Sequence, residues 1–328
     1  MLNFVDKPSF LIKTDATSDI DHLCAIVAPW DLYLKKMNRG KDFYGVVGML
    51  MAEEFLIFKT DLGGVLEQSG APPSGMRTLL VPVDDNQHFF WRNNTVTGNT
   101  IGLFPKGTEF NGTSKPGFKV YVISVSDQYL IDEVRKTGLD WMTLERSDCK
   151  DHQVVDGKTI IEIRRILSQL YRLKEITLDI HRQNMAFSSL KHKLINLLII
   201  NFFQFQTAYK PDPSNRLRIF KQFKEYINSH PAASFSSSEL CAYIGASERT
   251  LQYAIKDYTQ LTPNQYAKSL KLNMVRDKLL KREPDQIKIS QLAIEHGFWH
   301  TPQFATDYRI HFGELPTDTL KKQFNRSS

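Results

Sequence analysis

The chain has 328 residues, of which 41% are hydrophobic and 24% are charged, values that are ordinary for a soluble globular protein with room for two domains. Its formal net charge of +6 falls entirely on residues 216–328, which hold 17 basic and 11 acidic residues, since residues 1–215 hold 25 of each sign. We interpret this basic C-terminal segment as a surface that binds a partner carrying phosphates. The alternative, a solvated surface with surplus lysine, is less favoured.

Cysteine content and apolar segments exclude several other classes of protein. The three cysteines include no C-x-x-C pair, so neither a disulfide framework nor a zinc site is expected, and a reducing compartment fits. The N-terminus lacks a basic segment followed by an apolar run, and the most apolar run, residues 194–203, is too short to span a bilayer. We therefore expect a cytoplasmic protein without a membrane partner.

The first part of the chain, to about residue 126, predicts short strands separated by turn sequences rich in Gly, Pro, Asn and Asp. Because no segment with helical periodicity is long enough to form a crossover helix between them, an antiparallel barrel or jelly roll is expected. The predicted strands span residues 32–36, 43–51, 54–59, 78–83, 88–92, 100–104 and 119–124.

A barrel of this size can enclose a small-molecule effector. The candidate lining residues are the aromatic Phe43, Phe58 and Phe90, and the candidate anchors for a ligand carboxylate are Lys59 and Arg92. For each aromatic residue the alternative is simple packing in the core, and for each cation it is exposure to solvent.

Few metal ligands occur in the same region. Its only histidines are His22 and His88, with no His-x-His pair, so no metal, cofactor or catalytic site is predicted. A metal-dependent enzyme fused to a second domain is the least favoured alternative.

From about residue 127 the hydrophobic period becomes that of a helix. A short helix that ends at Gly138 is followed by helices over about 160–176 and 185–207. Their apolar faces need a partner, which can be the barrel or a second subunit. Residues 209–215 contain two prolines and predict a linker between a domain of residues 1–208 and a domain of residues 216–328.

The second domain contains one helical motif twice, at residues 237–256 and 290–309. Each copy predicts a short apolar helix, a glycine that can take positive φ, and a second helix with a capping residue, which is the order of a helix-turn-helix. The predicted capping residues are Ser247 in the first copy and Thr301 in the second. Gly245 recurs as Gly297, about fifty residues later. A single copy of the pattern is weak evidence for a helix-turn-helix, and its recurrence makes the evidence strong. Residues 262–281 predict the helix that joins the two copies, with Thr262 and Gln265 as a capping box at its start.

These residues resemble the AraC/XylS family of bacterial transcription regulators over roughly the last 110 residues. The stretches that carry the resemblance are Gly297-Phe298, Gln303-Phe304 and Phe312-Gly-Glu-Leu-Pro316, and residues 297–308 look most like the ethanolamine-operon regulator subgroup. The resemblance implies an α+β protein: a cupin-like antiparallel β-barrel with helices, followed by an all-α double helix-turn-helix domain. It also implies double-stranded promoter DNA as partner, a small-molecule effector, a homodimer and contact with RNA polymerase.

The resemblance also assigns DNA-facing positions, residue by residue. Arginine can read guanine and glutamine can read adenine through two hydrogen bonds, whereas contacts to phosphate only position the protein. The expected base contacts are Arg249, Gln252, Tyr253, Thr301, Gln303 and Thr306, and the expected phosphate contacts are Ser247, Lys256 and Arg309.

A transcription regulator controlled by an effector in the barrel is the leading interpretation. The main alternative is a DNA-binding regulator without an effector, which a barrel without a cavity would favour. The sequence identifies neither the effector nor the operator, and it does not separate activation from repression.

Overall fold

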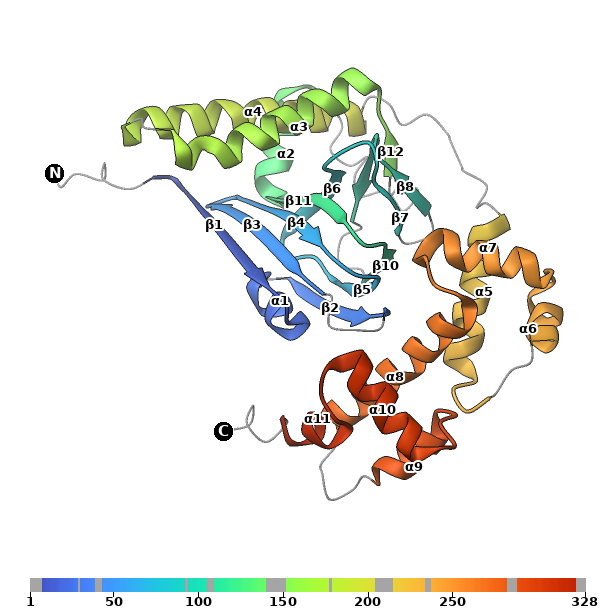
Figure 1. The fold of residues 1–328 in the computed structure, drawn as a ribbon. Helices are drawn as coiled ribbons and strands as arrows, with labels where there is room; N and C mark the ends of the chain where they lie inside the picture. Colours follow the sequence, from blue (N-terminus) through green and yellow to red (C-terminus); the bar gives the residue numbers. More distant parts are fainter. Residues whose placement is uncertain are drawn as a thin grey trace.

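The computed structural model describes residues 8–28, 30–38, 43–91, 94–104, 109–139, 152–176, 179–203, 215–233, 237–281 and 288–322. Two β-sheets and their covering helices form the N-terminal part, and a group of helices lies beside them (Figure 1). Within these residues, no helix has the length and hydropathy needed to span a membrane.

The described strands form two antiparallel sheets. One has the strand order β1-β3-β4-β11-β6-β9-β12 and the other β2-β5-β10-β7-β8, and no described strand of one pairs with a strand of the other. The strands are β1 (Phe10–Thr17), β2 (Asp31–Lys36), β3 (Gly45–Ala52), β4 (Phe55–Leu62), β5 (Leu66–Ala71), β6 (Met76–Pro82), β7 (His88–Trp91), β8 (Asn94–Thr97), β9 (Thr100–Leu103), β10 (Phe110–Ser114), β11 (Phe118–Ser126) and β12 (His152–Val154).

Alternation along the strands divides their side chains among three cores. In β4, Phe55 and Ile57 face the covering helices, whereas Phe58 faces the other sheet. In β7, Trp91 points between the sheets while Phe90 points outward, toward the C-terminal helices. The molecule therefore has four layers: helices, large sheet, small sheet and C-terminal helices.

The space between the sheets is filled by aromatic side chains. The ring centroid of Trp91 lies 4.3 Å from that of Phe104 and 5.0 Å from that of Phe110. A cavity of about 60 Å³ lined by Phe58 remains there, which is room for about two water molecules.

Helices α2 (Asp127–Lys136), α3 (Gly157–Arg172) and α4 (Ile180–Phe203) cover the outer face of the large sheet, with the short η2 (Leu173–Glu175) between the last two (Figure 1). Two polar side chains fasten α3. Arg164 donates from Nε to the Pro82 carbonyl at 2.9 Å and pairs with Asp85 at 2.6 Å. The Tyr171 hydroxyl lies 3.0 Å from the Gly48 carbonyl oxygen and 2.9 Å from that of Ile57.

The C-terminal helices follow in two groups around one long helix. The first group packs on the small sheet, and the second lies at the end of β2 (Figure 1). The helices are α5 (Asn215–Ser229), α6 (Ser237–Ile244), α7 (Glu248–Thr259), α8 (Pro263–Lys281), α9 (Ile289–Glu295), α10 (Thr301–Phe312) and α11 (Pro316–Lys322).

The predicted α+β class is confirmed, with antiparallel sheets before a helical domain. Instead of a closed barrel, the described strands form an open sandwich. The prediction missed the short helix α1 (Ile20–Ile26) and the strands β1, β5, β8, β10 and β12. Strands such as β5, with the sequence LEQSGA, are polar and contain glycine, so they lack the alternation that marks a strand. Most of the predicted linker, residues 209–214, lies outside the described residues.

The Tyr171 hydroxyl yields a stability prediction. Tyr171→Phe leaves two buried carbonyl oxygens without their shared donor and is expected to lower the free energy of unfolding by about 1–2 kcal/mol. Urea denaturation followed by circular dichroism measures the change. Tyr243→Phe is the control, because Tyr243 is 57% exposed. An equal loss in both variants would contradict the assigned role of the hydroxyl.

Candidate nucleic-acid interface

The first helix-turn-helix consists of α6 and α7. Gly245 between them has φ 68°, a conformation that glycine adopts at little cost. Ser247 begins α7 as predicted, since its hydroxyl accepts a hydrogen bond from the Thr250 amide at 3.2 Å. Leu251 and Ile255 are buried, so the opposite face of α7 is left to solvent.

That solvent face of α7 carries the predicted contact residues Arg249, Gln252, Tyr253 and Lys256, and all four are exposed. Arg249 donates to the Tyr253 hydroxyl at 3.4 Å, and its guanidinium carbon lies 5.5 Å from the centre of the tyrosine ring. The tyrosine thus restricts the orientation of the arginine before any partner binds.

The second helix-turn-helix consists of α9 and α10 and repeats this arrangement. Gly297 at its turn has φ 78°. The residue that caps α10 is His300, whose Nδ1 accepts from the Gln303 amide at 3.4 Å, and not Thr301, which is the first residue of the helix. The corrected cap leaves the Thr301 side chain exposed.

The predicted contact residues of α10 are also exposed: Thr301, Gln303, Thr306 and Arg309. The Thr306 hydroxyl donates to the Pro302 carbonyl at 3.1 Å, so it is left as an acceptor toward a partner. Trp299, just before α10, is 66% exposed and was missed as a candidate. Its position between the glycine turn and the start of the second helix, next to the other predicted contact residues, was the available signal.

Helix α8 joins the two motifs and begins with the predicted capping box. The Thr262 hydroxyl accepts from the Gln265 amide at 3.3 Å, and Gln265 Oε1 accepts from the Thr262 amide at 2.9 Å. Further along, Lys268 pairs with the buried Asp307 of α10 at 2.5 Å, and Lys271 donates to the Ala233 carbonyl at 2.7 Å. One helix therefore sets the positions of both motifs.

Gly297 is required for a second reason at this junction. A Cβ atom at this position would lie 3.0 Å from the Ala232 carbonyl oxygen and 3.1 Å from Lys271 Nζ. The turn of the second motif thus lies against the segment between α5 and α6 of the first.

The small sheet completes the core of the first motif. Phe90 inserts between helices, with its ring centroid 5.8 Å from that of Phe220 and 6.0 Å from that of Tyr258. Met37 and Val65 belong to the same buried cluster. The N-terminal part and the C-terminal helices therefore share a hydrophobic core in this arrangement.

A buried carboxylate, Glu67 of β5, lies at the centre of that contact. It accepts hydrogen bonds from Thr113 at 2.7 Å and from the Tyr266 hydroxyl, and it pairs with Lys224. Burial, followed by the nearby charge of Glu67, raises the pKa of the Tyr266 hydroxyl well above its usual value, so this group stays a donor.

A second contact joins β2 to α8 and α10. The Lys36 carbonyl accepts from Asn273 Nδ2 at 2.8 Å and from His311 Nε2 at 2.7 Å. Asp277 pairs with Lys35 at 3.0 Å and accepts from the Tyr33 hydroxyl. Burial raises the pKa of the Asp277 carboxyl to about 6 and lowers that of the Lys35 ammonium, which reflects the cost of removing this pair from water.

The four predicted effector-pocket residues that the structure describes do not line one cavity, although Phe43 and Phe58 belong to the same core between the sheets. Phe58 lines the small inter-sheet cavity, Phe90 lies in the shared core, and Phe43 lines a different cavity, at the contact with α8. Lys59 is exposed, with its ammonium 5.8 Å from the ring centre of Tyr121. Arg92 lies outside the described residues.

Comparison with known proteins agrees with the two motifs. Residues 240–322 match a family model described as a helix-turn-helix domain. The chain is 31% identical to XylDLEGF operon transcriptional activator 3 of Pseudomonas putida over 104 residues, 32% of this chain and 31% of that protein. It is 34% identical to activator 2 of the same operon over 101 residues, 31% of this chain and 64% of that protein. Residues 240–322 are thus a helix-turn-helix domain that is similar to part of these activators.

These matches cover only part of each activator. Among solved structures, the AraC-like transcriptional activator CuxR aligns with 80% of this chain and 94% of its own, at 10% identity and a TM-score of 0.44. That value is too low to support an inference about the N-terminal part.

The Lys268–Asp307 pair yields a prediction for the second motif. Lys268→Met leaves the Asp307 carboxylate buried without this ammonium and is expected to cost about 2 kcal/mol or more, chiefly in α10. Hydrogen exchange should show faster exchange of the α10 amides, with α7 unchanged. Lys321→Met, at an exposed position, is the matched control. Unchanged protection of α10 would show that the ion pair does not hold this helix.

Proposed function

We propose that this chain is a transcription regulator of the AraC/XylS type that binds promoter DNA through α7 and α10. The observation that carries the proposal is the exposure of both recognition faces while the helices that bear them are held on the N-terminal part. The concentration of the whole positive excess in residues 216–328 supports it.

The proposed base contacts are Arg249, Gln252 and Tyr253 in one groove and Thr301, Gln303 and Thr306 in the next. Ser247, Lys256 and Arg309 are proposed to contact phosphate. Trp299 joins them as a candidate for packing against the sugar–phosphate backbone. Because the side chains of the two helices differ, the two half-sites are expected to differ in sequence.

The division of labour between the two parts of the chain is also a proposal. Residues 1–208 would sense and dimerise, and residues 216–328 would bind DNA. Exposed Ile161 on α3 and Met185 on α4 support a homodimer through these helices. The likeness of residues 297–308 to the ethanolamine-operon regulator subgroup and contact with RNA polymerase have no support beyond the sequence resemblance.

A regulator without a ligand inside its sandwich is the second candidate. The filled space between the sheets favours it, because about 60 Å³ is well below the roughly 300–1,000 Å³ of small-molecule sites. If an effector controls this protein in the arrangement described, it binds elsewhere.

Arg249 yields the first prediction for DNA binding. Arg249→Ala is expected to weaken operator binding by about 1–3 kcal/mol, or roughly 5- to 150-fold, and to relax the preference at one base position. Electrophoretic mobility shift assays on a set of single-base operator variants measure both effects. Arg172→Ala, on the exposed surface of α3, is the control. Unchanged affinity and base preference would remove Arg249 from the interface.

Helix α8 yields the second prediction. Its 19 residues span roughly 28 Å at 1.5 Å each, close to the helical repeat of DNA of about 34 Å. One chain is therefore expected to read two half-sites about one turn apart and to protect on the order of 20 base pairs. Hydroxyl-radical footprinting of the full chain and of a Gln303→Ala/Thr306→Ala variant tests this.

The double variant should lose protection at one half-site only. Gln291→Ala, on the exposed face of α9, serves as its control. Protection of both half-sites by the double variant would show that α10 does not read the sequence.

A further inference from the structure

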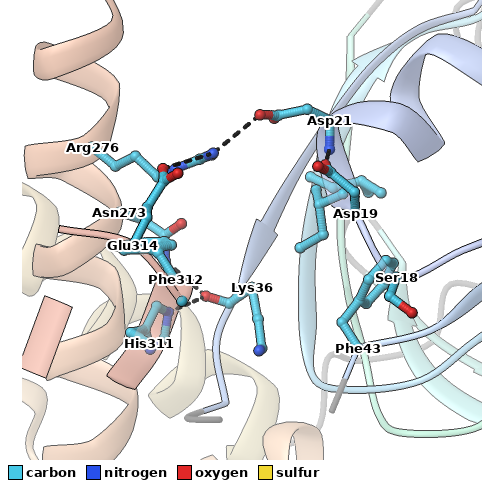
Figure 2. Close-up of a pocket in the computed structure, with 13 residues that line it drawn as sticks. Ser18, Asp19, Asp21, Lys36, Phe43, Asn273, Arg276, His311, Phe312 and Glu314 are labelled. Carbon is cyan, nitrogen blue, oxygen red and sulfur yellow. Dashed lines mark hydrogen bonds and ion pairs between the residues drawn. The ribbon is translucent and has the colours of Figure 1, made fainter. Parts of the chain in front are cut away.

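A cavity of about 380 Å³ lies where α1 and β2 of the N-terminal part meet α8 and the end of α10. Figure 2 shows its two walls facing each other, with Asp19, Asp21 and Phe43 on one side and Arg276 and Asn273 on the other. Its volume is in the range of small-molecule sites and several times that of the cavity between the sheets. A ligand here would touch both parts of the protein.

The charges around the cavity are unevenly matched. Three carboxylates line it, and Arg276 pairs with Asp21 at 3.1 Å and approaches Glu314 at 3.9 Å. The third, Asp19, makes no ion pair with a described residue. Its Oδ1 accepts from the amides of Asp21 and His22 at the start of α1, and no described residue donates to Oδ2.

An acceptor on the opposite wall is also without a donor. Asn273 is 4% exposed, and its Nδ2 donates to the Lys36 and Ser269 carbonyls, both at 2.8 Å. These two bonds fix the orientation of the amide, and no described residue donates to Oδ1. In Figure 2 this oxygen points into the cavity. The oxygen is therefore open to the cavity as an acceptor, and the site favours a ligand that supplies a donor to it.

The remaining lining groups fit an organic cation better than a metal ion. Phe43 and Phe312 present aromatic surface to the cavity, which attracts organic cations. Among the described residues, no three His, Cys, Asp or Glu side chains are placed to hold a metal ion. The Lys36 side chain points away from Asp19 and Asp21 (Figure 2).

We propose that this cavity binds a small organic ammonium compound that carries a second hydrogen-bond donor, such as a short diamine. One ammonium pairs with the Asp19 carboxylate on the N-terminal wall. The second donor reaches Asn273 Oδ1 on the α8 wall, and the carbon chain lies against the two phenylalanines.

Such a ligand acts as an effector through the domain contact, and this step depends on the proposed DNA-binding function. It binds only when both walls are present, so it shifts the population toward the docked arrangement. The α8 wall belongs to the helix that sets the spacing of α7 and α10. Occupancy of the cavity therefore changes DNA affinity, and operator DNA changes ligand affinity by the same factor.

Isothermal titration calorimetry of the full chain tests the site without DNA. The probes are 1,5-diaminopentane and 1,4-diaminobutane, with glutarate as the dianion of similar length and pentane-1,5-diol as the neutral control. At least one diamine should bind, and glutarate should not. Failure of both diamines, or tighter binding of glutarate, would overturn the proposal.

Asp19→Asn is the decisive variant, because asparagine is as good an N-cap as aspartate and keeps α1. It should weaken diamine binding roughly tenfold or more, the effect of losing a charge-assisted hydrogen bond, with an unchanged melting temperature. Asp15→Asn, on the exposed face of β1, should bind as the parent chain does. Equal binding by the Asp19→Asn variant and the parent chain would place the diamine elsewhere.

Mobility shifts on operator DNA, with and without the diamine that binds, test the coupling. The diamine should change the DNA affinity of the parent chain and leave that of Asp19→Asn unchanged. A diamine that binds in calorimetry without altering DNA affinity would overturn the proposed coupling, whereas the proposed binding site would stand. If the parent chain binds no DNA at all, the proposed function is refuted. Calorimetry would still show whether the cavity binds the diamine.

Discussion

The arrangement of this molecule depends on the buried and half-buried polar side chains along α8. Lys268, Lys271 and Asn273 would each be costly inside a helical domain without a partner, and each has one on a different element: α10, the segment before α6, and β2. A helix buried all round by apolar residues could slide or rotate with little penalty. Directional hydrogen bonds at successive positions instead fix the register of α8 against both motifs and the sandwich.

The same contacts make the N-terminal part a structural support of the C-terminal helices. Phe90 fills the core of the first motif, and the Glu67 carboxylate accepts hydrogen bonds from α5 and α8, which pack with that motif. Near the second motif, Asn273 of α8 and His311 of α10 instead hold the main-chain carbonyl of Lys36. The sandwich thus contacts each motif by a different chemistry, apolar in one place and polar in the other, so a change at β2 can affect the second motif without opening the first.

The local structure could be predicted where period and capping dominate. Gly245 and Ser247 take the conformation and the cap that their residue types predict, and the capping box of Thr262 and Gln265 forms as expected. The cap of α10 was assigned one residue too late, because a histidine nitrogen accepts there. The tertiary contacts could not be predicted from the sequence. The aromatic residues of the first 126 residues are compatible with a lined cavity or a filled core, and only the facing of the two sheets decides between them.

The outward direction of Phe90 shows why the interface could not be read in advance. Phe89, Phe90 and Trp91 are three aromatic residues in succession, so strand alternation must expose one of them on the face away from the inter-sheet core. That residue needs cover from outside the sandwich, and α5 and α7 provide it. An unbroken apolar run in a short strand of an antiparallel sheet therefore already implied a second covering layer. Which helices would supply it depends on where the chain leads after α4, and the composition of residues 209–215 predicts a linker but not its direction.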